Sequence, residues 1–92
     1  MLTKARLEEI RNQLLKNAQS LPNGSKRVEF NLAKGEMPSQ GNLKALSEAL
    51  YPHVGGYWLQ TFRVSHVRTD KGREYIELLI KHRDPPDDPY PV

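Results

Sequence analysis

The stretch that decides the fold is residues 57–83, YWLQTFRVSHVRTDKGREYIELLIKHR. Two runs rich in aromatic and β-branched residues flank the segment Thr69-Asp70-Lys71-Gly72-Arg73. That segment fits a three-residue hairpin loop with glycine in the left-handed position. We therefore expect one long antiparallel hairpin, with Thr69 paired to Arg73 at its closed end.

This register sorts the side chains of the hairpin onto two faces. One face is apolar and is predicted to be the core face, with Trp58 as a core anchor. It carries Trp58, Phe62, Val64, Ile76, Leu78 and Ile80. Gln60, His66 and His82 lie at the ends of this face, with His82 opposite Gln60. The other face is mixed and basic, and we expect water to reach it; it carries Thr61, Arg63, Ser65, Val67, Tyr75, Glu77, Leu79, Lys81 and Arg83.

Upstream of the hairpin, the pattern changes from a period of two to helical spacing. After the capping residue Thr3, apolar residues recur at three- and four-residue steps, at Leu7, Ile10, Leu14, Ala18 and Leu21. Pro22-Asn23-Gly24 is expected to end this helix. Glu8 and Arg11 can pair on its outer side.

Between the helix and the hairpin, Lys26 to Leu32 alternates apolar and polar residues and predicts a half-buried strand. A loop over 33–41 leads into a short second helix, Asn42 to Tyr51, with Asn42 or Ser39 as its cap and Pro52 as its stop. The sequence therefore predicts an α+β fold: a small three-stranded antiparallel sheet with a long C-terminal hairpin, the amphipathic N-terminal helix packed on it, and the short second helix.

The 92 residues are enough for one domain, which we place at 1–83. This domain contains 14 lysines and arginines and eight acidic residues. Residues 84–92, by contrast, contain Asp84, Asp87, Asp88, four prolines and no cation. We interpret 84–92 as an acidic, proline-rich tail. The chain has no cysteine and no apolar run long enough to span a bilayer. With no signal-peptide pattern at Met1-Leu2-Thr3-Lys4, a cytosolic protein without membrane contact is expected.

No motif for a nucleophile, a phosphate loop or a dinucleotide site is present, and Gly55-Gly56 precedes a strand instead of a helix. In the expected register, His66 and His82 lie roughly 20 Å apart along the strands and cannot share a metal. We therefore expect no enzyme, no cofactor, no small-molecule substrate and no metal site. Acid–base catalysis by one histidine, as in a small metal-independent nuclease, stays open as an alternative.

The basic residues are the strongest functional signal in the chain. They are the candidate binding residues for nucleic acid or a partner: Lys26, Arg27, Arg63, Arg68, Lys71, Arg73, Lys81 and Arg83. Tyr57 and Tyr75 share the hairpin face of Arg63, a mixture that suits phosphate contacts with base stacking. The alternatives are a solvated sheet face, a protein partner, or a stand-alone nucleic-acid-binding module.

The chain resembles anti-CRISPR proteins that act on multi-subunit RNA-guided complexes. The resemblance lies in the general build: the Leu7–Leu21 helix, the Trp58–Arg83 hairpin and the Arg63/Lys81/Arg83 face. The resemblance rests on no diagnostic motif, so no residue role is carried over. It implies a non-enzymatic inhibitor, encoded by a phage, that docks on a nucleoprotein complex in a bacterial host cell and contacts protein subunits or guide RNA. The basic body departs from the acidic DNA mimics among these inhibitors and favours RNA or an acidic protein surface.

Overall fold

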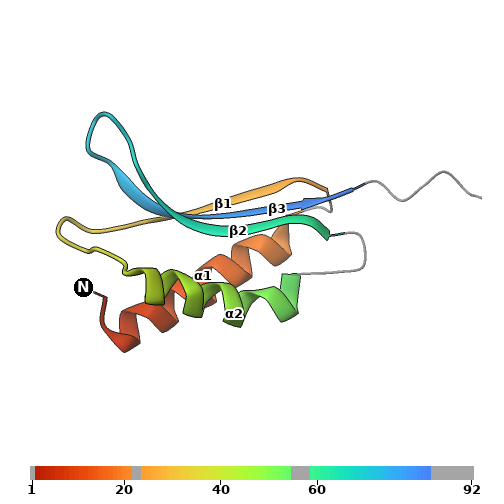
Figure 1. Cartoon of the computed structure of the whole chain (residues 1–92), viewed down its shortest axis with the longest axis horizontal. Coiled ribbons are helices and arrows are strands. Elements are labelled where there is room, and N and C mark those ends of the chain that lie inside the picture. The colour runs from red at the N-terminus through yellow and green to blue at the C-terminus, as the bar shows by residue number, and fades with distance from the viewer. Residues whose placement is uncertain (1, 22–23, 55–58, 84–92) are drawn as a thin grey trace, which may run out of the picture.

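The computed structural model describes residues 2–21, 24–54 and 59–83. Within them the chain forms two helices and a three-stranded antiparallel sheet, so the predicted α+β class is confirmed (Figure 1). The expected core anchor Trp58 and the tail 84–92 lie outside the described residues. No helix in the described ranges is long and apolar enough to cross a membrane.

The hairpin consists of β2 (Leu59–Arg68) and β3 (Glu74–His82) in the predicted register. The Thr69 N–H donates to the Arg73 carbonyl over 2.8 Å, and the Gly72 N–H donates to the Thr69 carbonyl over 2.9 Å. Gly72 has φ +84°, in the left-handed region that side chains disfavour. The glycine therefore closes the loop that the sequence predicted.

The register fails at the open end of the hairpin, where His82 pairs with Leu59 and not with Gln60 as expected. The pairing shifts between Leu59 and Thr61, because β2 contains one residue more than β3 over this stretch. A constant register carried along from the turn cannot detect such an irregularity.

The third strand, β1 (Lys26–Asn31), pairs antiparallel with β3, so the order in the sheet is β1-β3-β2. The predicted alternation holds: Val28 is buried, and Phe30 and Leu32 pack partly against the core. The last strand along the chain is therefore the central strand of the sheet.

The first helix, α1 (Lys4–Ser20), begins where the sequence predicted, since the Thr3 hydroxyl accepts from the Arg6 N–H over 3.1 Å. Ile10, Leu14 and Ala18 are buried on its inner side. On its outer side, Arg11 and Glu8 lie 3.6 Å apart, as expected.

The second helix is longer than predicted. It is α2 (Gln40–Val54), with Pro52 inside its last turn. Ser39 is the cap: its hydroxyl accepts from the Asn42 N–H over 3.0 Å, and the Asn42 side chain accepts from the Ser39 N–H over 2.9 Å. Proline removes one backbone donor, but burial of Val54 beside Leu50 keeps the last turn against the core. Pro52 therefore does not stop the helix.

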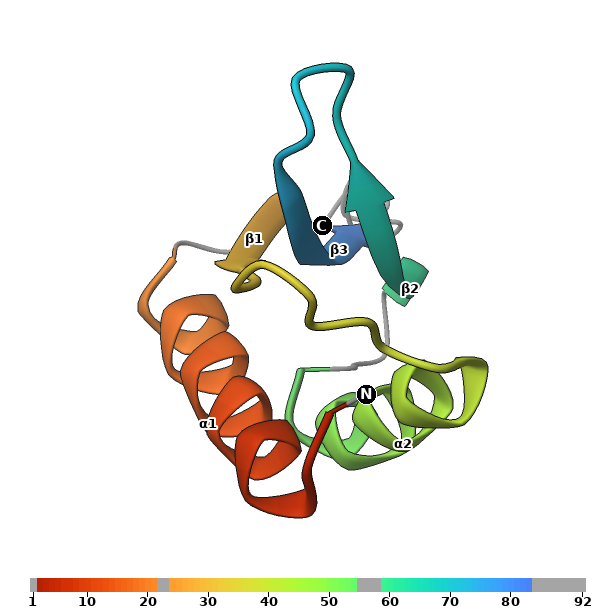
Figure 2. The ribbon, with the colours of Figure 1, turned by 90° about the vertical axis from the view of Figure 1, so that its left-hand side faces the viewer.

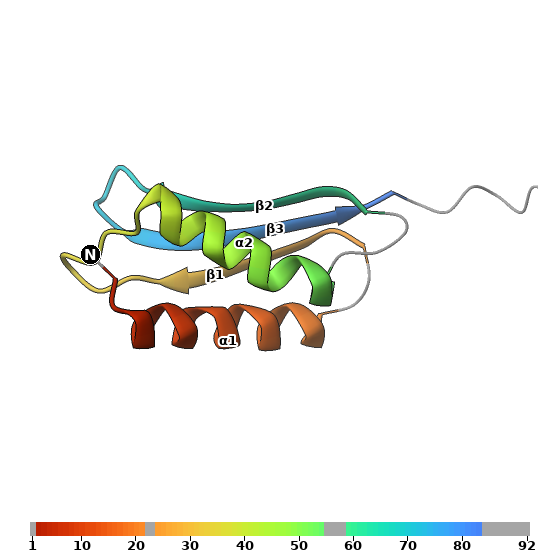
Figure 3. The ribbon, with the colours of Figure 1, turned by 60° about the horizontal axis from the view of Figure 1, so that its bottom comes forward.

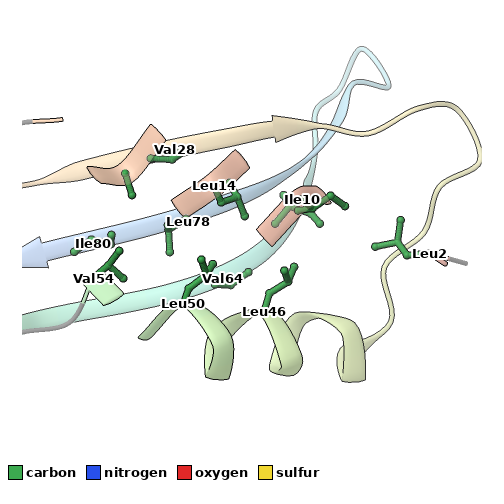
Figure 4. Packing of buried hydrophobic residues seen from close by; sticks show 12 residues of the cluster. Leu2, Ile10, Leu14, Val28, Leu46, Leu50, Val54, Val64, Leu78 and Ile80 are labelled. Atoms are coloured by element: carbon green, nitrogen blue, oxygen red, sulfur yellow. The ribbon is translucent and has the colours of Figure 1, made fainter. Parts of the chain in front are cut away.

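Both helices lie side by side on one face of the sheet (Figures 2 and 3). Between the two layers is a single apolar core, with side chains from α1, α2 and all three strands pointing toward one another (Figure 4). Its fully buried members include Ile10, Leu14, Leu46, Leu50, Ile76, Leu78 and Ile80. The opposite face of the sheet carries no helix in the described part of the chain.

Candidate functional site

The helix-free side of the sheet is the candidate site, and we call it the open face. Its side chains come from alternate positions of the three strands: Arg27, Glu29 and Asn31 from β1; Tyr75, Glu77, Leu79 and Lys81 from β3; and Thr61, Arg63, Ser65 and Val67 from β2. Arg73 in the turn reaches back onto it. The sequence predicted the hairpin part of this face correctly.

Arg63 and Lys81 are two exposed cations of the open face. Arg63 lies opposite Leu79, and Lys81 is two residues further along β3, so the two cations are diagonal neighbours, with backbones about 7–8 Å apart. Among the described residues neither forms an ion pair, whereas Arg27 and Arg73 do. Arg83, at the next matching position after β3, is also exposed. These positive charges face solvent.

Arg27 is bound within the face. Its guanidinium donates to Glu77 over 2.7 Å and to the Tyr75 hydroxyl over 3.1 Å, and it lies 3.9 Å from Glu29. These contacts, led by the hydrogen bond to Tyr75, raise the pKa of Arg27 above its ordinary value. Glu29 and Glu77 are directly opposite across β1 and β3, and Arg27 offsets their repulsion.

Arg73 covers Tyr75, with its guanidinium carbon 4.6 Å from the ring centre. The guanidinium also donates to Asn31 over 2.8 Å and lies 3.3 Å from Glu29. Tyr75 is consequently only 4% exposed. The expectation that Tyr75 offers its ring for base stacking is wrong, because an arginine already occupies that position. Tyr57, the other predicted stacking residue, lies outside the described residues.

Three predicted binding residues are placed away from the open face. The Lys26 ammonium donates to the Ala18 carbonyl over 3.1 Å, at the last turn of α1, where a cation is favourable. Arg68 lies on the helix side and donates to Glu74 over 3.0 Å; this contact is the main cause of the lowered pKa of Glu74. Lys71 is exposed in the hairpin turn. The candidate set therefore divides, and only Arg27, Arg63, Arg73, Lys81 and Arg83 stay together.

The histidines have separate surroundings. The His66 Nε2 lies 3.1 Å from a Glu74 oxygen, and the His82 Nδ1 is buried without a hydrogen-bond partner among the described residues. Within the described ranges no group of three metal-ligating side chains occurs.

The sequence reasoning missed the role of the acids on this face. Glu29 and Glu77 hold Arg27 and Arg73 in place, yet their proximity depends on pairing between β1 and β3, which are far apart in the sequence. The alternation Arg27, Glu29, Asn31 was the available signal, since it assigns all three side chains to one side of a strand.

Comparison with known proteins gave no match at any level: no protein-family model, no curated protein and no solved structure matches the chain.

Proposed function

We propose that this chain is a non-enzymatic binding protein that contacts the RNA of a nucleoprotein complex through its open face. The observation that carries the proposal is the pair Arg63 and Lys81: adjacent and exposed, with no ion pair to a described residue. Arg83 extends this cationic group along the same side. Exposed, closely spaced cations favour an anionic partner.

The second support is the fixed position of the neighbouring arginines. Arg27 and Arg73 are held by Glu77, Glu29 and Tyr75, so their guanidinium groups lose little further conformational freedom on binding. Arg27 lies across Leu79 from Arg63 on the same face, so it adds a fixed positive charge beside the exposed pair.

The chemistry favours the RNA backbone over its bases. Tyr75 is covered by Arg73, and the described part of the open face presents no other aromatic ring. Phosphate contacts supply affinity without sequence information, so we expect binding that depends little on base sequence and strongly on salt. The resemblance in build to anti-CRISPR proteins supports a multi-subunit RNA-guided complex as the target class.

The experiment compares two charge-reversal variants with the same change in net charge. One is the open-face variant Arg63→Glu, Lys81→Glu, Arg83→Glu; the other is the helix-layer control Lys4→Glu, Lys16→Glu, Lys44→Glu, whose lysines are all exposed on or beside α1 and α2. Affinity for a single-stranded RNA oligonucleotide is measured from 50 to 300 mM salt. Circular dichroism verifies that both variants are folded.

We expect the open-face variant to lose binding and the control to retain most of it. Each phosphate of a single strand that a cation neutralises contributes about −0.7 to the slope of log affinity against log salt concentration. If each of the three cations neutralises one phosphate, together they contribute about −2 to the wild-type slope. Equal losses in the two variants would show that only net charge matters, and would overturn the assignment of the open face.

A capture experiment separates the complex from free RNA. The tagged protein is incubated with a bacterial lysate, with and without ribonuclease. Capture of a defined protein complex that ribonuclease abolishes supports the proposal. Capture of bulk nucleic acid alone indicates the alternative, a stand-alone nucleic-acid-binding module.

A further inference from the structure

The acidic segment 84–92 directly follows Arg83, the last described residue after the central strand. The segment carries Asp84, Asp87 and Asp88 and no cation. The strand that leads into it carries Lys81, beside Arg63. An anionic segment is thus attached at the edge of an exposed cationic surface.

The lengths agree with a contact between the two. Lys81 is two residues before Arg83, and the pair of Leu79 with Arg63 is four residues before it, so these positions lie roughly 7 Å and 13 Å back along β3. Asp87 and Asp88 follow Arg83 by four and five residues, which span at most about 13–18 Å when extended. Part of this span is used in the reversal, so Lys81 lies within reach of both carboxylates if the segment turns back, and the long side chain of Arg63 shortens the remaining distance to that residue.

We propose that residues 84–92 dock on the open face, with Asp87 and Asp88 at Arg63 and Lys81, and compete there with anionic partners. The docking stands on the sheet geometry and the charges alone; its consequence as a brake on RNA binding rests on the function proposed above.

Three properties favour this occupant. Its charge is opposite to that of the face. A short tether gives an effective concentration in the millimolar range, so weak ion pairs are sufficient. Its four prolines limit the conformations lost on docking and cannot donate ladder hydrogen bonds, so the segment is suited to lying over the face and not to adding a strand at the sheet edge.

The docking is tested without any partner. Because the chain has no cysteine, Val92→Cys provides a single site for a paramagnetic label. We expect the label to broaden the amide signals of Arg63, Leu79 and Lys81 far more than those of α1 and α2 at 50 mM salt. The preference should disappear at 300 mM salt and in the variant Asp84→Asn, Asp87→Asn, Asp88→Asn. Broadening that is uniform over the two layers would overturn the docking.

The competition is tested by affinity for a single-stranded RNA oligonucleotide. The triple Asn variant is compared with Glu8→Gln, Glu9→Gln, Glu48→Gln, which removes the same charge from exposed helix positions. We expect the tail variant to bind about tenfold more tightly at 50 mM salt, with most of the gain lost at 300 mM as screening shortens the range of the interaction. An equal gain in RNA affinity in the helix control would show that only net charge matters. That result would refute competition between the tail and RNA for the open face. The two proposals can also fail separately. If the label broadens signals of the open face preferentially, but neither the wild type nor either variant binds RNA, the proposed function is refuted and the docking stands.

Discussion

Tyr75 provides the sharpest test of how the open face is built. It lies in the central strand with Asn31 and Val67 directly across from it, and it is 4% exposed although no described helix covers it. Its cover is the Arg73 guanidinium, and its hydroxyl accepts from Arg27. We predict that Tyr75 stabilises the sheet and does not contact bases, so two substitutions should separate these roles.

Tyr75→Ala removes a whole ring from a buried position. Large aromatic residues in cores lose about 3–5 kcal/mol when truncated to alanine. Since water can enter from the open side, we expect the lower end, about 3 kcal/mol. At roughly 4–8 °C per kcal/mol for a domain of this size, the midpoint of thermal unfolding should fall by about 12–24 °C. Tyr75→Phe keeps the ring and loses only the hydroxyl, so its effect should be a small fraction of that loss.

The assays are urea denaturation for stability and RNA affinity for function. Tyr75→Phe should bind single-stranded RNA as the wild type does, because Arg63 and Lys81 are unchanged. If Tyr75→Ala unfolds at the wild-type urea concentration while losing RNA affinity, then Arg73 moves away and the ring stacks on bases. That result would refute the present account of the open face.

Two further predictions concern the scaffold. The Arg6 guanidinium donates to both oxygens of Glu36, at 2.8 and 3.1 Å, and this pairing, together with the Ala33 N–H, lowers the pKa of Glu36. The stabilisation from this pairing is present above the unfolded pKa of about 4.3 and is lost as pH falls through the lower pKa of the folded state. The urea midpoint of Glu36→Gln should therefore lie below that of the wild type at pH 7 and approach it at pH 3. A difference in midpoint that stays constant with pH would contradict this. Gly72→Ala should cost about 1–2 kcal/mol in urea denaturation, because φ is +84° although nothing lies within 4 Å of the added Cβ; an unchanged midpoint would show that the loop adopts another conformation.

The hairpin could be predicted because its information is local. The alternation on both sides of Gly72 fixes the turn, the register and the two faces together, and the structure has the same pairs from Thr61–Lys81 to Arg68–Glu74. The error at His82 arises from one extra residue near the start of β2, which no local pattern marks.

The rest of the site depends on contacts that are distant in the sequence. Arg27 and Glu77 are 50 residues apart, and only the pairing of β1 with β3 brings them together. Lys26 and Arg27 are adjacent, yet alternation sends one toward the end of α1 and the other to the open face. Composition alone counts both as binding cations, whereas the pleat of the strand separates them.

The length of α2 also depends on contacts that are distant in the sequence. A proline predicts a helix end from local backbone chemistry, but burial of Val54 depends on the packing of α2 against the sheet. Tertiary contacts therefore decide the last turn, and they are invisible to a local rule.

The central position of β3 has a consequence for amide hydrogen exchange. The Thr69–Arg73 bond and the Leu32–Glu74 bond indicate that odd residues of β3 bond toward β2 and even residues toward β1. Every amide from Glu74 to Ile80 thus has a neighbouring strand to bond with, whereas Arg27, Glu29 and Asn31 direct theirs away from the sheet. The edge amides can exchange with solvent from the native state, while those of β3 exchange only when a neighbouring strand detaches or the whole domain opens. Deuterium labelling would therefore read the free energy of β1 detachment and that of global unfolding from alternate residues of a single strand.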